Sequence, residues 1–217
     1  MRTDHGEGRA GGRRYQARHD PERRTARRAE LLDAAIACIR RVGPDASMEQ
    51  IAAEARVTKP IVYRFFRDKG DLYQAIAERY VGLVGDGIRA ALATTDDPKA
   101  LLKAGIDAYL GLVEQEPEIY RFLMTRAREY STAAVAIENF IHQLGGELGG
   151  VLGEQLAAAG LDTGGAEVWG HAIVGMVNAA SDWWVDRQVL SRRRLVHYLV
   201  DLLWGGFDGM TPEEARS

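Results

Sequence analysis

The sequence has one cysteine and no long apolar segment, and each absence excludes a class of protein. Cys38 has no partner for a disulfide within the chain and lies in an apolar helical pattern, so we expect a reduced core residue of a cytoplasmic protein. Because no run of about 18 apolar residues is present, the chain is not expected to cross a membrane. No apolar segment follows the N-terminal arginines, so we expect no secretory signal.

Motifs of common catalytic and nucleotide-binding sites are also missing. The sequence contains no HExxH, no GxSxG, no P-loop and no GxGxxG following a strand. The five histidines are scattered along the chain, and one cysteine cannot build a zinc site. The sequence therefore predicts no enzyme activity, no metal site and no cofactor.

The net charge of −3 argues against a nucleic-acid partner until its distribution is considered. Residues 1–80 carry 17 basic and 12 acidic side chains, a balance of +5, whereas residues 81–217 carry 11 and 19, a balance of −8. This asymmetry predicts a basic module joined to an acidic one. We expect the basic module to be the part that meets phosphate groups.

Residues 1–25 are rich in glycine and arginine and nearly empty of large apolar side chains. Such a segment cannot bury enough surface to fold alone, so we expect a disordered basic arm. Its Arg13, Arg14 and Arg18 could follow the minor groove or the backbone of DNA, or the arm could be a solvated tail. At the other end of the chain, we expect residues 209–217 to form a flexible tail.

From Ala26 onward the apolar residues recur at helical spacing, and no segment shows the alternation of a strand. The pattern predicts an all-α fold, with a first helix over residues 25–42 and a buried Cys38. The buried stripe of this helix is predicted at Leu32, Ala35, Ile36, Ile39 and Val42. The stretch ATTDDP at 93–98 interrupts the pattern and separates a module of residues 26–88 from one of residues 97–208. The later helices are expected over residues 68–88, 97–115, 118–128, 131–159, 164–188 and 192–207.

Two short helices joined by a tight turn are predicted after the first helix. In the stretch SMEQ, Ser47 and Gln50 can form a capping box, and Thr58 is a natural N-cap with Pro60 in the first turn that follows. This is the layout of a helix-turn-helix, which completes a three-helix DNA-binding domain. Lys69 begins the next helix, where a cation opposes the helix dipole, and a bound phosphate would remove that conflict.

Residues 28–75, RAELLDAAIACIRRVGPDASMEQIAAEARVTKPIVYRFFRDKGDLYQA, resemble the DNA-binding domain of TetR-family transcriptional regulators. The shared features are an amphipathic first helix ending in VG, the stretch SMEQIAAEARV, and Tyr63, Phe66 and Lys69 in the arrangement Y-x-x-F-x-x-K. Arg56 departs from the pattern, because many members have Gly or a small residue in that turn. The resemblance implies a homodimer that places two recognition helices in successive major grooves of a palindromic operator.

The start of the recognition helix is the part expected to approach base edges. Lys59 could contact guanine or phosphate, and Pro60 or Ile61 could touch a thymine methyl group. Ser47, Thr58, Tyr63 and Lys69 are expected on phosphates, although Ser47 is also a helix cap and a surface arginine such as Arg64 is often only solvated. The predicted DNA-binding residues are Ser47, Thr58, Lys59, Pro60, Ile61, Tyr63, Arg64 and Lys69.

The resemblance also implies that the acidic C-terminal domain serves dimerisation and ligand sensing. We place the dimer face on the last two helices, where small residues permit close approach and leucines follow at helical spacing; two helices from each chain would form a four-helix interface. Burial inside the chain's own core is the alternative for the same residues. The predicted interface residues are Ala172, Gly175, Ala179, Leu195, Leu199, Leu202, Leu203 and Trp204.

Aromatic and aliphatic residues of the C-terminal domain predict a largely apolar chamber, which suits a lipophilic effector. His171, Asn178 and Asp182 could supply polar contacts, although aromatic residues at helical spacing are often plain core residues. The stretch YLGLVEQEPEIYRFLM is similar to regulators of lipid metabolism in the family. The candidate ligand-binding residues are Tyr109, Leu112, Val113, Tyr120, Phe122, Leu123, Phe140, Leu144, Trp169, His171, Ile173, Met176, Val177, Asn178, Asp182 and Trp183.

The sequence thus predicts a dimeric transcriptional regulator, most simply a repressor released from its operator by an acyl chain, an acyl-CoA or another small lipophilic effector. A drug-responsive efflux regulator, an activator, and a helical ligand-binding protein with a vestigial DNA-binding motif remain alternatives. We expect the effector to change the spacing of the two recognition helices, acting through the joint between the helix of residues 68–88 and the helices of residues 97–128.

Overall fold

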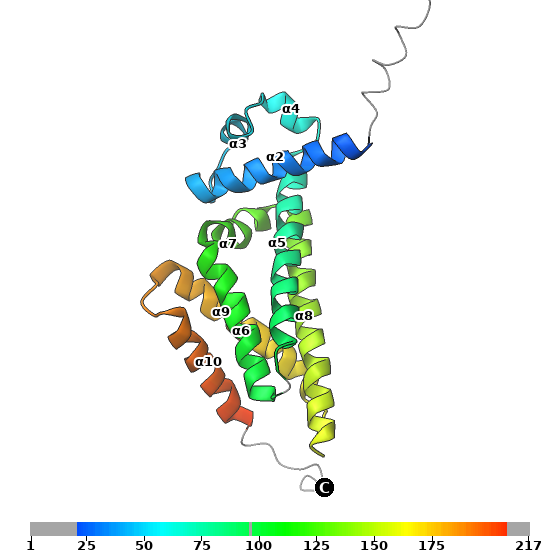
Figure 1. Cartoon of the computed structure of the whole chain (residues 1–217), viewed down its shortest axis with the longest axis vertical. Helices are drawn as coiled ribbons and strands as arrows, with labels where there is room; N and C mark the ends of the chain where they lie inside the picture. Colours follow the sequence, from blue (N-terminus) through cyan, green and yellow to red (C-terminus); the bar gives the residue numbers. More distant parts are fainter. Residues whose placement is uncertain (1–20, 96, 208–217) are drawn as a thin grey trace, which may run out of the picture.

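The computed structural model describes residues 21–95 and 97–207, which fold into helices joined by short connections (Figure 1). No β-strand occurs among these residues, so the predicted all-α fold is confirmed. None of the helices in these two ranges is long and apolar enough to cross a membrane. The elements are α2 (Pro21–Val42), α3 (Met48–Glu54), α4 (Lys59–Tyr63), α5 (Lys69–Leu92), α6 (Pro98–Gln115), α7 (Pro117–Met124), the 3-10 turn η1 (Ala127–Glu129), α8 (Ser131–Ala158), α9 (Ala166–Arg187) and α10 (Arg192–Phe207).

Three helices depart from the sequence prediction by more than two residues. The first helix begins at Pro21, so residues 21–25 of the predicted arm are helical. Proline is suited to a first helical position and Glu22 to the first turn, which compensates for the lack of large apolar residues there. Helix α5 continues to Leu92, and the predicted helix 118–128 divides into α7 and η1. Residues 1–20, with Arg13, Arg14 and Arg18, and the predicted tail 209–217 lie outside the described residues.

The N-terminal module packs α2, α3, α4 and the first half of α5 around one apolar core. Helix α2 buries the predicted stripe at Leu32, Ala35, Ile36 and Ile39, whereas Val42 at its end is 37% exposed. Cys38 is buried in the same core, as expected. This core therefore orients α3 and α4, which lie beyond α2 at one end of the molecule (Figure 1).

The capping box predicted at the start of α3 is present. The Ser47 hydroxyl accepts from the Gln50 amide at 3.2 Å, and the Gln50 side chain accepts from the Ser47 amide at 2.8 Å. The turn that follows contains Arg56 at φ 53°, a left-handed conformation that favours glycine. Arg56 therefore holds a left-handed backbone conformation that carries a steric cost of about 1 kcal/mol for a residue with a Cβ.

The rest of the molecule is a bundle in which α5 and α8 run side by side and α9 packs across α8 (Figure 1). A second apolar core forms where α6, α9 and α10 meet, around Leu110, Val177, Trp184 and Val196. Helix α5 belongs to both parts, because its first half is in the N-terminal core and its second half faces α6 and α8. A movement of α5 would therefore change the packing of both parts.

Candidate functional site

The eight predicted DNA-binding residues gather at the α3 N-terminus, on α4 and at the start of α5. Thr58, Pro60, Tyr63 and Arg64 are exposed, while the other four are partly exposed. Thr58 stands at the N-cap position of α4, but its side chain makes no cap hydrogen bond. The hydroxyl of Thr58 is thus not committed to the helix, in contrast to that of Ser47.

Lys59, at the first position of α4, is held by a residue that the sequence analysis did not single out. Its Nζ lies 2.5 Å from Oε1 of Glu49 on α3, and 6.0 Å from the ring centroid of Tyr63. The hydrogen bond to Glu49 raises the pKa of Lys59, and the same contact lowers the pKa of Glu49. The signal for this pair was the acidic residue in the first turn of α3, ten positions before the lysine.

Lys69 sits at the start of α5 against two aromatic rings. Its Nζ lies 5.0 Å from the ring centroid of Tyr73 and 6.0 Å from that of Tyr130, and the hydrogen bond to Tyr73 raises the pKa of the lysine. Tyr130 immediately precedes α8, so this cation is positioned by both modules. The two rings also pack edge to face at 5.1 Å.

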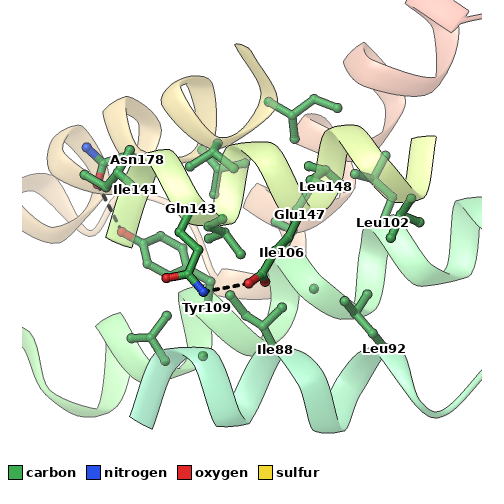
Figure 2. Close-up of a pocket in the computed structure, with 18 of the residues that line it drawn as sticks. Ile88, Leu92, Leu102, Ile106, Tyr109, Ile141, Gln143, Glu147, Leu148 and Asn178 are labelled. Carbon is green, nitrogen blue, oxygen red and sulfur yellow. Dashed lines mark hydrogen bonds between the residues drawn. The ribbon is translucent and has the colours of Figure 1, made fainter. Parts of the chain in front are cut away.

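A cavity of about 600 Å³ lies inside the C-terminal bundle, within the range of small-molecule sites (Figure 2). Its wall is formed by α5, α6, α7, α8 and α9, with Trp204 of α10. Along α8 the wall runs from Ile137 to Leu156, roughly 28 Å of helix at 1.5 Å per residue. Aliphatic side chains such as Ile88, Ile106 and Leu148 dominate it, so the cavity suits an elongated apolar ligand.

Two tyrosines supply polar groups at the α9 side of the cavity. The Tyr109 hydroxyl donates to Oδ1 of Asn178 at 3.1 Å (Figure 2), and the Tyr120 hydroxyl donates to Oδ1 of Asp182 at 2.5 Å. Burial raises the pKa of Tyr109 to about 12 and raises the pKa of Tyr120 as well. Both hydroxyls are therefore neutral at physiological pH and can exchange hydrogen bonds with a ligand.

Ten of the predicted ligand-binding residues line this cavity: Tyr109, Leu112, Val113, Tyr120, Leu123, Phe140, Leu144, Ile173, Val177 and Asn178. Six do not. Phe122 packs in the N-terminal core, with its ring 4.6 Å from that of Tyr73, and Asp182 reaches the cavity through Tyr120 alone.

The other four belong to helix surfaces that face elsewhere. Trp169 lies against Gly165, and Met176 packs on the second core. The His171 ring lies 5.8 Å from that of His142. Trp183 is 43% exposed. Helical periodicity identified these residues as apolar or amphipathic, but it could not tell which side of α9 faces the cavity.

The cavity also contains residues that sequence reasoning missed. Helix α5 contributes Val84, Ile88 and Leu92 to the wall. Their spacing of four residues continues past residue 88, and this repeat could have predicted both the longer helix and its cavity-lining side. Helix α8 contributes Gln143 and Glu147, which are hydrogen-bonded to each other at 2.8 Å (Figure 2). Exposed polar residues of this kind gave no sequence signal.

The comparison with known families decides the identity of both modules. Residues 31–76 match the model described as "Bacterial regulatory proteins, tetR family". Residues 87–215 match the model described as "Tetracyclin repressor-like, C-terminal domain", which covers more than half of the chain. The chain belongs to the TetR family. It is a DNA-binding transcriptional regulator with an N-terminal helix-turn-helix, as the sequence predicted.

Individual transcriptional regulators are similar to most of the chain or to part of it. An uncharacterised HTH-type transcriptional regulator of Mycobacterium tuberculosis strain H37Rv is 36% identical over 192 residues, which is 87% of this chain and 80% of the relative. The HTH-type transcriptional activator FasR of Mycolicibacterium smegmatis is 37% identical over 101 residues, 46% of each protein. The crystal structure of the regulator FadR from Bacillus subtilis in complex with stearoyl-CoA has a TM-score of 0.66 at 20% identity, covering 81% of this chain and 96% of that one.

The residues predicted for a TetR-family dimer face divide into two groups. Ala172, Gly175 and Ala179 form an exposed strip on α9, and Leu202 on α10 is 66% exposed. The remaining four face inward, because α10 packs on α6 through the same leucine repeat. Of these, Leu195 and Leu199 are buried in the second core, Leu203 packs against it, and Trp204 lines the cavity.

Proposed function

We propose that this TetR-family protein is a homodimeric repressor that binds a palindromic operator through α4 and is released by a lipophilic effector, an acyl-CoA or a fatty acid. In this proposal the DNA-binding module extends to about residue 88, and residues 97–208 bind the effector and the second subunit. The elongated apolar cavity is the observation that carries the effector class.

DNA binding is assigned to the exposed end of the molecule formed by α3 and α4. Thr58, Lys59 and Pro60 begin the recognition helix, the part that approaches base edges in helix-turn-helix proteins. Tyr63 and Arg64 follow on the exposed side, and Ser47 and Lys69 flank them at two further helix starts. Two such surfaces, related by the symmetry of a dimer, would read two half-sites of a palindrome.

Dimerisation is assigned to the exposed strip of α9 together with α10. Ala172, Gly175 and Ala179 have small side chains, which let a second helix approach closely, and Val168 and Trp183 extend the strip with 68% and 43% exposure. Exposed apolar side chains gathered on one face of a helix pair mark an interaction surface. Leu202 on α10 would then meet the partner subunit.

The effector is assigned from the shape and chemistry of the cavity. The wall extends along roughly 28 Å of α8, mostly with aliphatic side chains, which is more extended than a compact drug requires. The FadR structure of similar fold holds stearoyl-CoA. In this chain Tyr109 and Asn178 offer neutral hydrogen-bonding groups to the thioester or carbonyl of an acyl ligand.

Two matched variants test the effector. Gly105 lines the cavity, and an added Cβ there would meet only Leu92 at 3.7 Å, so Gly105→Leu should fill the cavity without disrupting the fold. Gly146 is exposed on α8 with nothing near it, so Gly146→Leu is the control. With free stearoyl-CoA at about 100 times its Kd, the folded protein should gain about 2.7 kcal/mol of stability.

Thermal unfolding with stearoyl-CoA should show this gain in the wild type and in Gly146→Leu, and a smaller gain in Gly105→Leu. Mass spectrometry of the purified protein should find co-purified acyl species in the same two proteins. Saturating stearoyl-CoA without any change of Tm in the wild type, together with no acyl species by mass spectrometry, would exclude the lipid effector.

A lipophilic cation is the second candidate, because Glu147 contributes a carboxylate to the cavity wall whose hydrogen-bond partner is the neutral amide of Gln143. Tetraphenylphosphonium is a suitable probe, and Glu147→Gln should weaken its binding while leaving that of stearoyl-CoA unchanged. Electrophoretic mobility shift with selected DNA sequences tests the operator itself. A protein with a vestigial motif would form no salt-sensitive specific complex.

A further inference from the structure

One ion pair joins the corner between α6 and α7 to the N-terminal module. Glu116 ends α6 and precedes Pro117, the first residue of α7. Arg40 in the last turn of α2 holds its carboxylate at two points: Nε donates to Oε2 at 2.7 Å, and Nη2 donates to Oε1. The same Nη2 donates to the Tyr80 hydroxyl on α5 at 3.2 Å.

Glu116 and Tyr80 also belong to the wall of the ligand cavity. A single guanidinium, that of Arg40, therefore connects two wall residues with α2. Helix α2 carries the turn at Gly43 that leads directly to α3 and α4, and its core residues hold these helices in place. Whatever changes the position of Glu116 in the wall changes the support of the DNA-binding helices.

The backbone around Glu116 forms a rigid corner. Its amide donates to the Leu112 carbonyl at 3.0 Å, and its carbonyl accepts from the Tyr120 amide at 2.9 Å, so the residue caps α6 and α7 at once. Pro117 further restricts the backbone of Glu116, which stands at φ −129° and ψ 52°, outside the helical region. Because the corner cannot absorb a displacement by local bending, a ligand pressing on it shifts the carboxylate as well.

We propose that Glu116 is a positioning residue: its contact with Arg40 fixes α2, and with it the two recognition helices of the dimer, at the separation the operator requires, and occupation of the cavity displaces this contact. The inference rests on the proposed function and names the residues of its regulation. A fork-to-carboxylate contact fixes orientation as well as distance. The side chains of Arg40 and Glu116 are 51% and 23% exposed, so the pair adds little to global stability and its effect is geometric.

The positioning role is tested on the apo protein with operators selected from random DNA. Binding is measured for the selected operator and for derivatives whose half-sites are moved apart by inserted base pairs. The wild type should discriminate sharply between spacings, and Glu116→Gln should reduce that discrimination. The charge-swapped double variant, Arg40→Glu with Glu116→Arg, should restore it, which loss of a merely structural contact would not predict.

The control is the second ion pair between the same parts of the chain. Asp45, in the turn before α3, forms an ion pair with Arg126, which lies between α7 and α8. Neither residue lines the cavity. Asp45→Asn should leave the spacing discrimination unchanged. Equal discrimination in wild type, Glu116→Gln and Asp45→Asn would overturn the positioning role.

The link to the cavity is tested without any ligand by combining variants. Gly105→Leu should lower operator affinity relative to Gly146→Leu, because a filled cavity displaces the corner. In the Glu116→Gln background the effect of Gly105→Leu should largely disappear. Unchanged operator affinity in Gly105→Leu, or additive effects in the double variant, would overturn the link.

The same comparison with stearoyl-CoA separates this inference from the proposed function. Failure of stearoyl-CoA to bind the wild type removes the proposed effector, and the variant tests above still decide the role of Glu116. Absence of any selected operator removes the proposed function as a whole and this inference with it. When stearoyl-CoA binds, it should release operator from the wild type and from Asp45→Asn, and should release it less from Glu116→Gln; equal release from all three overturns the inference.

Discussion

Gly170 of α9 and Gly145 of α8 lie backbone against backbone. A Cβ placed on Gly170 would come within 2.3 Å of the Gly145 carbonyl oxygen and 2.5 Å of the Gly149 amide nitrogen. Neither atom can move without displacing a whole helix. The two helices therefore cross at a distance that only glycine permits, and this crossing fixes the side of α9 that faces the cavity.

Gly170→Ala should destabilise the protein by about 3 kcal/mol, because overpacking against backbone cannot be relieved by a rotamer change. Gly146→Ala, on the exposed side of α8 with nothing within 4 Å, should instead gain up to about 1 kcal/mol from its helix propensity. Urea denaturation at one fixed protein concentration measures both. Equal stability of the two variants would contradict the close crossing.

Ser47 and Thr58 both occupy N-cap positions, but their replacement by alanine should affect different properties, stability for Ser47 and operator binding for Thr58. Ser47→Ala removes a cap hydrogen bond and half of a capping box, so it should lower the free energy of unfolding by about 1 kcal/mol. Thr58→Ala removes no cap bond and should change stability by less than about 0.5 kcal/mol while weakening operator binding. Denaturation and mobility-shift titrations on both variants decide the matter. A stability loss at Thr58 without a binding loss would argue against its DNA contact.

Lys69→Ala should weaken binding to all DNA sequences and lower the slope of log K against log salt by about one unit, because one phosphate contact is lost. The matched control is Lys103→Ala, which removes the same charge from the exposed side of α6 in the other module. Fluorescence anisotropy at several salt concentrations measures both slopes. If the two variants give the same slope, Lys69 does not contact phosphate.

The raised pKa of Tyr109 predicts a loss of folding stability at alkaline pH. Its folded pKa of about 12 exceeds the ordinary value of about 10, so between these values the folded state keeps a proton that the unfolded chain releases. Stability should fall as pH rises through this window, by up to about 1.4 kcal/mol per pH unit for the group. Tyr109→Phe should flatten the decline in denaturation experiments and should cost about 1 kcal/mol at neutral pH through the lost bond to Asn178. Parallel alkaline declines in the two proteins would refute this assignment.

The local parts of the structure followed from the sequence because their signals are local. Ser47 and Gln50 predict their capping box from a spacing of three, and the apolar repeat from Leu32 to Ile39 predicts the buried face of α2. Ten cavity residues were identified because apolar side chains of a helical bundle face inward as a class. Trp169 and Trp183 were misplaced because periodicity gives a helix face and not the neighbour of that face.

The sequence by itself determined most of the helices, the capping box at Ser47 and the recognition motif, since these depend on residues at most a few positions apart. The tertiary structure alone decided which residues meet across long separations. Arg40 reaches Glu116 over 76 positions, and Tyr109 reaches Asn178 over 69. Such contacts depend on how whole helices cross, and in α8 and α9 that crossing is set by the absence of a Cβ at Gly170, whose consequence appears only once the two backbones are packed together.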